Sequence, residues 1–300
     1  MRFGLLLISL LLACGHKKAP EESPIGMDPA LTQKALLYRQ LAPGYQYEAG
    51  FVTDDCDALL FSALGAVGGL QVDLTAARNE DGEWFRTPQK DCYPNKSSSS
   101  ISRDMLLGVM IAAWASRDLD MAERLYKYGA DHLWIMGSGF PSRTFFNPEI
   151  TATLAQLSYK LGGPDRAIRN FPVSWSATGI SDFEAHLQVL HIILRRAIYD
   201  KIEPSAQEVL NAQATRQPEN ALFQWAALNT PKAVELLKDT RYWPSDRLPN
   251  SGDRCEQWLF QRDSGSSDWL PCEGETPDTP SKIYTGADFL FVERLIELGL

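Results

Sequence analysis

The chain has 300 residues, a formal net charge of −9 at pH 7 and 44% hydrophobic residues. This balance is typical of a globular protein with one large domain or two small ones. The acidic charge and the lack of a basic cluster argue against nucleic acid and strongly anionic molecules as partners.

The first residues have the composition of a secretory leader. Met1 and Arg2 form a short basic start, an apolar run covers residues 3–12, and Ala13 precedes Cys14. The run is too short to span a membrane as a helix of the mature protein. An ordinary signal peptide covering residues 1–13 and a lipoprotein leader both fit this pattern.

The stretch "LLAC" at 11–14 resembles the lipobox of bacterial lipoproteins. The resemblance implies cleavage before Cys14 and acylation of that cysteine, so that the chain is anchored in a membrane. Gly15 stands where an aspartate holds many lipoproteins at the inner membrane, so the expected location is the outer membrane of the bacterial cell envelope. Residues 14–28 are expected to be a polar, lipidated tether and residues 29–300 one domain.

Helical periodicity dominates the rest of the chain. Several predicted helices are apolar on most sides, and such helices lie inside a larger helical assembly. Others carry a single apolar stripe, with residues at i, i+3, i+4 and i+7, and face water on the other side. The apolar group is 54–69, 102–114, 181–199, 219–229 and 285–299, and the striped group is 28–43, 118–136, 149–163, 204–217 and 230–240.

This alternation predicts an all-α protein with inner and outer layers of helices, an α/α toroid. Three-helix stacking and an open solenoid are alternatives, whereas no recurring signature supports a tetratricopeptide array. An outer helix is missing between 70 and 100, so we expect an incomplete toroid. That stretch and 241–284 are predicted to be long loops, and loops of this length are usually functional or disordered.

Four cysteines remain after Cys14, in a compartment that is expected to be oxidising. Three pairings are possible. We predict Cys56–Cys92 and Cys255–Cys272, because each pair brackets a loop-rich stretch and clamps it. No cysteine pair has C-x-x-C spacing, so we predict no metal site, and no motif indicates a cofactor.

Acidic residues gather at the predicted starts of the inner helices. If these helices run parallel, their starts open on one face, where Asp55, Asp57, Arg103 and Asp104 would line a cleft. Two carboxyl groups, one protonated and one ionised, are what general acid–base catalysis needs. Helix capping favours the same residue types, and we assign Glu184 to that structural role.

Tryptophans in predicted loops could stack on sugar rings, or they could fix the loops to the core. Trp175 is one of them. The segment 241–272 combines tryptophan with many Asp and Arg residues, so it is a candidate wall of a binding site. The predicted substrate-binding residues are Arg103, Trp84, Asp253, Arg254, Trp258 and Trp269. His186 and His191, five residues apart on an apolar helix, are interpreted as core histidines.

The stretch "SSSSISRDMLLGVMIAAW" at 97–114, an amphipathic partner and "LWIMGSG" at 133–139 resemble the six-hairpin (α/α)6 glycosidases and polysaccharide lyases. The likeness is architectural and spreads over residues 28–300. It implies a sugar-binding groove lined by acidic residues at inner-helix starts. Asp55 or Asp57 would then act with Asp104 as acid and base.

The favoured hypothesis is therefore a lipid-anchored glycoside hydrolase that cleaves a peptidoglycan-like or amino-sugar polysaccharide. A non-catalytic helical scaffold that binds a glycan or a partner is the alternative, and it predicts that the carboxylates are capped or paired with arginine. A polysaccharide lyase is the third possibility. It would use a cluster such as Tyr126, Tyr128 and His132, but their helix is predicted to be an outer one.

Overall fold

The structure is a computed structural model that describes residues 28–54, 56–90, 101–137, 144–176, 182–255 and 271–299. Over these residues the chain is mostly helical, which confirms the all-α prediction. Ten α-helices occupy the ten positions that periodicity predicts. They are α1 (Pro29–Leu41), α2 (Ala58–Val67), α3 (Arg103–Ser116), α4 (Leu119–Asp131), α5 (Pro148–Lys160), α6 (Asp182–Tyr199), α7 (Pro204–Arg216), α8 (Ala221–Ala226), α9 (Thr230–Lys238) and α10 (Ala287–Glu297). Short 3-10 helices cover Ala42–Tyr45, Glu48–Gly50, Leu74–Ala77 and Ala167–Asn170. Among the helices described here, none is both long and apolar enough to cross a lipid bilayer.

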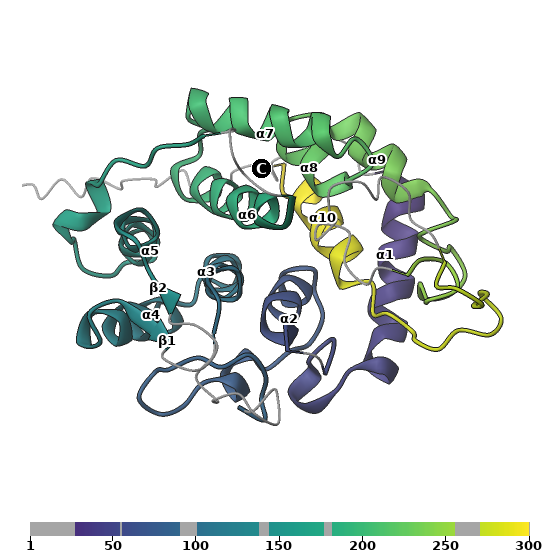
Figure 1. Cartoon of the computed structure of the whole chain (residues 1–300), viewed down its shortest axis with the longest axis horizontal. Coiled ribbons are helices and arrows are strands. Elements are labelled where there is room, and N and C mark those ends of the chain that lie inside the picture. Colours follow the sequence, from purple (N-terminus) through teal and green to yellow (C-terminus); the bar gives the residue numbers. More distant parts are fainter. Residues whose placement is uncertain are drawn as a thin grey trace, which may run out of the picture.

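The five helices predicted to be apolar on most sides lie at the centre of the molecule (Figure 1). They form a closed circuit: α2 contacts α3, α3 contacts α6, α6 contacts α8, α8 contacts α10, and α10 contacts α2. α2 and α3 are buried over nearly their whole length. Their sequences explain this position, because a helix with no polar face is stable only when other elements cover all its sides.

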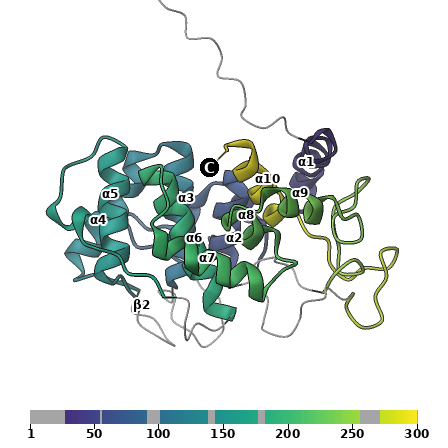
Figure 2. The ribbon, with the colours of Figure 1, turned by 90° about the horizontal axis from the view of Figure 1, so that it is seen from above.

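The helices with one apolar stripe lie outside this circuit. α4 and α5 pack on α3, α7 packs on α6 and α8, α9 packs on α8 and α10, and α1 packs on α9 and α10. Figures 1 and 2 both show α4 and α5 at one end of the molecule and α1 and α9 at the other. Between α2 and α3, the described residues 68–90 contain no α-helix, in agreement with the long loop predicted there.

A β-hairpin follows α4 where the periodicity predicted further helix. α4 ends at Asp131, and Leu133 and Trp134 then adopt positive φ angles of 54° and 64°, which end the helical path. The Trp134 amide donates to the carbonyl of Gly129 over 2.6 Å, so the chain folds back on its own helix. Strand β1 (Ile135–Gly137) then pairs antiparallel with β2 (Thr144–Phe145).

The starts of the inner helices do not all open on one face. The starts of α3 and α6 are neighbours, since Asp104 and His186 contact each other there. The start of α10 instead lies beside the C-terminal half of α2, where a Cβ at Gly65 would be 3.2 Å from that of Ala287. Seven residues separate Gly65 from the first residue of α2, which displaces the start of α10 by ~10 Å along that helix.

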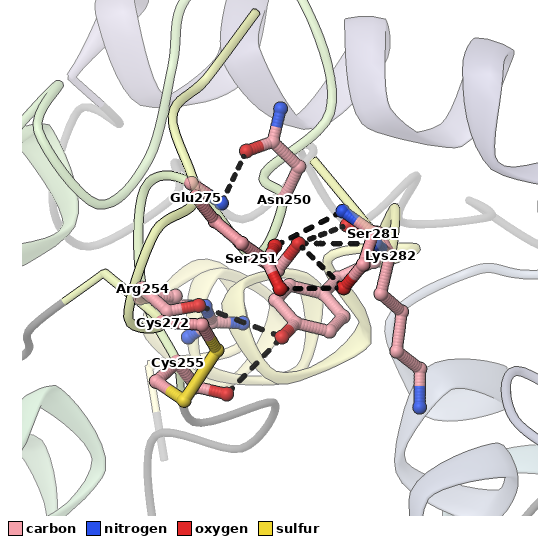
Figure 3. The surroundings of a disulfide bond; sticks show 10 residues. Asn250, Ser251, Arg254, Cys255, Cys272, Glu275, Ser281 and Lys282 are labelled. Atoms are coloured by element: carbon pink, nitrogen blue, oxygen red, sulfur yellow. Dashed lines mark hydrogen bonds between the residues drawn. A yellow bond between two sulfur atoms is a disulfide. The ribbon is translucent and has the colours of Figure 1, made fainter. Parts of the chain in front are cut away.

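The disulfide Cys255–Cys272 is present, as predicted (Figure 3). Beside it, Ser251 Oγ accepts a hydrogen bond from the Lys282 amide over 3.0 Å, which joins the chain before Cys255 to the chain after Cys272. Cys56 is also disulfide-bonded. Its predicted partner, Cys92, lies outside the described residues.

Candidate functional site

A pocket of about 230 Å³ lies where the starts of α3, α5 and α6 meet. Its volume suits one sugar-sized ring rather than a large cofactor. The segment that precedes α6 closes one side. The lining residues are Arg103 and Leu107 from α3, Asn147, Glu149 and Ile150 from the start of α5, Ser174 and Trp175 from the segment, and Glu184, Leu187, Gln188 and His191 from α6.

Helical spacing places these side chains. Arg103 and Leu107 are four residues apart, so they lie on one face of α3. The four α6 residues follow 3, 1 and 3 spacing and share one face of that helix for the same reason. At α5, Asn147 caps the helix by accepting from the Ile150 amide over 2.9 Å, and Pro148 occupies the first turn. Glu149 therefore sits in the first helical turn, where the helix dipole stabilises a negative charge.

Glu149 holds the neighbouring segment in place. Its Oε1 accepts hydrogen bonds from the amide of Ser174 over 3.2 Å and from the Ser174 hydroxyl over 3.1 Å. The next residue, Trp175, donates from its indole nitrogen to Glu203 over 2.7 Å. These bonds fix the half-buried indole at the edge of the pocket.

His191 lines the pocket with an uncharged imidazole ring. The Thr153 hydroxyl donates to the carbonyl of Glu149 over 3.0 Å, so its oxygen is left to accept from His191 Nε2 at 2.8 Å. Burial lowers the pKa of His191 to about 3, helped by the positive charge of Arg195. The ring is therefore uncharged at neutral pH, and Nδ1 carries a lone pair that no described residue uses.

Gln188 adds a second acceptor. Its Nε2 donates to the carbonyl of Ser176 over 3.0 Å, while its Oε1 is buried and makes no hydrogen bond with the described residues. A buried acceptor without a donor is costly, so a ligand group that donates to it would be favoured. Together with Glu149, Glu184 and His191, the pocket offers more acceptors than donors.

The two predicted catalytic residues that the structure describes, Asp57 and Asp104, do not line this pocket. Asp57 has a half-exposed side chain at the start of α2 and pairs with Arg86, whose guanidinium nitrogen is 3.0 Å from Asp57 Oδ1. Asp104 faces α6, where its Oδ2 lies 3.5 Å from His186 Nε2. Burial opposes ionisation of Asp104, but contact with His186 outweighs this and lowers the pKa of the carboxyl. Asp55 lies outside the described residues.

Three of the predicted substrate-binding residues that the structure describes, Trp84, Asp253 and Arg254, are buried. Trp84 is only 1% exposed and packs under Arg78, so its ring is closed to a sugar. Asp253 is buried and accepts two hydrogen bonds from Arg247. The burial of Trp84 and Asp253 is therefore contrary to the prediction that they bind substrate.

The position of Arg254 is also contrary to the prediction that it binds substrate. It is 1% exposed and pairs with the equally buried Asp288 at 3.0 Å. Its guanidinium also lies over the rings of Trp243 and Tyr284, at 4.4 and 5.4 Å from their centroids. This cluster joins the chain next to Cys255 to α10. Trp258 and Trp269 lie outside the described residues.

Among the predicted binding residues that the structure describes, Arg103 alone lines the pocket. Trp175 was recognised as a loop tryptophan, but Glu184 and His191 were interpreted as structural, and Glu149, Ser174 and Gln188 were missed. The sequence held a signal for Glu149, because Asn-Pro-Glu is a typical start of a helix. The contact with Ser174, 25 residues away, could not be read from the sequence.

Within the described residues, no group of three or more His, Cys, Asp or Glu side chains is arranged to hold a metal ion. Comparison with protein-family models, with curated proteins and with solved structures finds no match for this chain.

Proposed function

We propose that this chain is a lipid-anchored protein of the bacterial envelope that binds a glycan in the pocket between α3, α5 and α6. One observation carries the proposal: the pocket combines an indole ring with an excess of hydrogen-bond acceptors. A sugar is the complementary ligand, because it has an apolar ring face for Trp175 and hydroxyl groups that donate to Glu149, Gln188 and His191.

The pairing of the other carboxylates favours binding over the acid–base mechanism first expected. Asp57 pairs with Arg86, Asp253 with Arg247, and Asp288 with Arg254. Carboxylates that are already matched with arginine stabilise the fold, and they are poor candidates for proton transfer to a ligand. This is the pattern expected for the non-catalytic alternative.

We also propose that the fold is an incomplete α/α toroid. The closed circuit of α2, α3, α6, α8 and α10 and the outer helices around it support this description. The missing outer helix between α2 and α3 is the departure from a regular toroid. The disulfides would clamp the long loops that fill such gaps.

The ligand class follows from the charge of the site. Glu149 and Glu184 bring two carboxylates to the pocket, against one guanidinium from Arg103. A polyuronate would be repelled, so a neutral or amino-sugar glycan is the expected ligand. The leader ending in Cys14 and the disulfides fit an anchored protein in an oxidising compartment.

Hydrolysis is the second candidate, and one observation favours it. Glu149 and Glu184 line the same pocket, from the starts of two different helices. A pair of carboxyl groups flanking a bound sugar is the arrangement used by glycosidases. In this version of the hypothesis these two residues, rather than Asp57 and Asp104, would act on the glycosidic bond.

The test uses oxidised protein consisting of residues 15–300 and a panel of oligosaccharides: peptidoglycan fragments, N-acetylglucosamine and glucosamine oligomers, and a polyuronate. Calorimetry measures binding, and mass spectrometry measures products. We expect binding of a neutral or amino-sugar oligomer, weakened about tenfold by Trp175→Ala because stacking is lost, and retained by Trp175→Phe. Glu208→Gln on the exposed side of α7 is the control for a lost carboxylate.

Products heavier by one water that disappear in Glu149→Gln or Glu184→Gln would establish hydrolysis at this pocket. If these products disappear only in Asp57→Asn or Asp104→Asn, the catalytic site lies at the starts of α2 and α3 instead. Unsaturated products would establish a lyase. If no glycan binds, or if Trp175→Ala binds as well as the unmodified protein, the proposed site is wrong.

A further inference from the structure

A second cavity, of about 820 Å³, lies away from the glycan pocket, at the C-terminal ends of three inner helices. It is lined by residues 66–69 at the end of α2, by residues 114–117 at the end of α3, by Arg294, Glu297 and Leu298 at the end of α10, and by the start of α4. None of the residues of the glycan pocket contributes to this lining. The proposed function therefore leaves this cavity unexplained.

Three helix C-termini give the cavity a negative potential. The carbonyl groups at the end of each helix act as roughly half a negative charge, and this field favours a positive group. The ends of α2, α3 and α10 face the same space, so their contributions add. A cavity of this size also accommodates a ligand of several sugar or amino-acid units.

The side chains of α1 and α10 that line the cavity are already matched. Arg39 donates to the carbonyl of Gly68 over 2.8 Å and to Glu293 over 2.6 Å. Arg294 is hydrogen-bonded to Glu297 on the same helix. These four charged side chains cancel in pairs, so they add little to the field in the cavity.

Three charged side chains remain. Asp73 accepts through Oδ1 from the Thr75 amide at 3.0 Å, and Asp118 accepts through Oδ1 from the Met121 amide at 2.8 Å. The Oδ2 atoms of both are bonded to none of the described residues. Arg117 is exposed and forms no ion pair within the described chain. Two carboxylates against one guanidinium leave the cavity negative.

From this geometry we propose that the cavity binds a ligand carrying a primary ammonium group, such as an amino sugar or a polyamine. The ammonium group has three N–H donors, and the Oδ2 atoms of Asp73 and Asp118 supply acceptors for them. Trp114 also lines the cavity, and an indole ring attracts cations.

The experiment measures binding of a glucosamine trimer, of spermidine and of an N-acetylglucosamine trimer to oxidised protein of residues 15–300. The acetylated trimer has the same sugar rings without the positive charge, so it is the matched ligand control. We expect the two amines to bind and the acetylated trimer not to bind at this cavity, with affinity falling as salt rises.

Charge variants assign the site. Asp73→Asn and Asp118→Asn keep the capping hydrogen bond and remove the charge, so each should weaken amine binding about two- to fivefold. Arg117→Gln should tighten it by a similar factor, since the opposing charge is gone. Asp120→Asn, an exposed carboxylate on α4 that does not line the cavity, is the control and should have no effect.

The proposal is supported if either amine binds and the charge variants change its affinity as described. The affinities for the glucosamine trimer and for spermidine then show which amine the cavity prefers. The proposal is overturned if neither amine binds, if the acetylated trimer binds equally well in the same variants, or if Arg117→Gln weakens binding. Trp175→Ala acts on the glycan pocket alone. If Trp175→Ala loses amine binding while Asp73→Asn keeps it, the amine binds in the glycan pocket and the proposal is overturned.

Discussion

The neutral state of His191 makes stability depend on pH in a way that can be measured without a ligand. Its ordinary pKa is 6.5, and burial lowers this to about 3 in the fold. The unfolded chain therefore binds a proton at pH values where the folded chain does not. The stabilisation from this group is complete above pH 6.5 and is lost progressively as the pH falls toward 3.

The expected magnitude follows from the two pKa values. Stability falls by up to about 1.4 kcal/mol per pH unit in this window. Between pH 7 and pH 5, this single group should lower the free energy of unfolding by about 2 kcal/mol. Carboxyl groups whose pKa is lowered in the fold, such as Asp104 and Glu203, change the stability mainly at lower pH.

The assay compares urea unfolding at pH 7 and pH 5 for the unmodified protein and for His191→Gln, with the disulfides intact. Glutamine can still donate to Thr153, but it does not titrate. Between pH 7 and pH 5, the free energy of unfolding of His191→Gln should fall by about 2 kcal/mol less than that of the unmodified protein. This difference does not depend on how stable the variant is at pH 7. Equal losses in the unmodified protein and His191→Gln would refute the reasoning.

Three further predictions concern the fold. Asp288→Asn leaves Arg254 buried without its counter-charge and should lower the free energy of urea unfolding by about 3 kcal/mol. Adding Arg254→Met to this variant should restore part of the lost stability. If Asp288→Asn alone loses no stability, the pairing is contradicted. Gly129→Ala places a methyl group 2.6 Å from an indole ring atom and should cost about 1–3 kcal/mol in thermal unfolding, so an unchanged Tm would show that the ring moves freely. The double variant Cys255→Ser/Cys272→Ser opens a loop whose ends are 17 residues apart and should cost about 3 kcal/mol, and equal stability in calorimetry would mean that this bridge does not constrain the unfolded chain.

The helices could be predicted from the sequence because their signals are local. The apolar stripe of α4 and the absence of a polar face on α2 and α3 determine which helices are inner and which are outer. The hairpin after α4 could not be predicted in this way. It depends on positive φ angles at Leu133 and Trp134 and on the packing of Trp134 against Gly129, and neither leaves a periodic trace.

The site was harder to predict because charge pairing is a long-range property. Asp57 and Arg86 are 29 residues apart, and Arg254 and Asp288 are 34 apart. Sequence reasoning could place each carboxylate at a helix start, but it could not find the arginine that neutralises it. Tryptophan was ambiguous for the same reason: Trp84 and Trp175 both lie in loops, yet only the first is covered on all sides.

The polar start of α3 shows how one helix end serves two purposes. Arg103 and Asp104 are adjacent, so their side chains differ in direction by about 100° around the helix axis. Asp104 is turned toward α6, where contact with His186 fixes the start of one helix against the start of the other. Arg103 is turned toward α5 and lines the pocket proposed to bind a glycan. Two adjacent residues of one helix start therefore have different roles: the Asp104 carboxylate contacts α6, and the exposed Arg103 guanidinium lines the pocket.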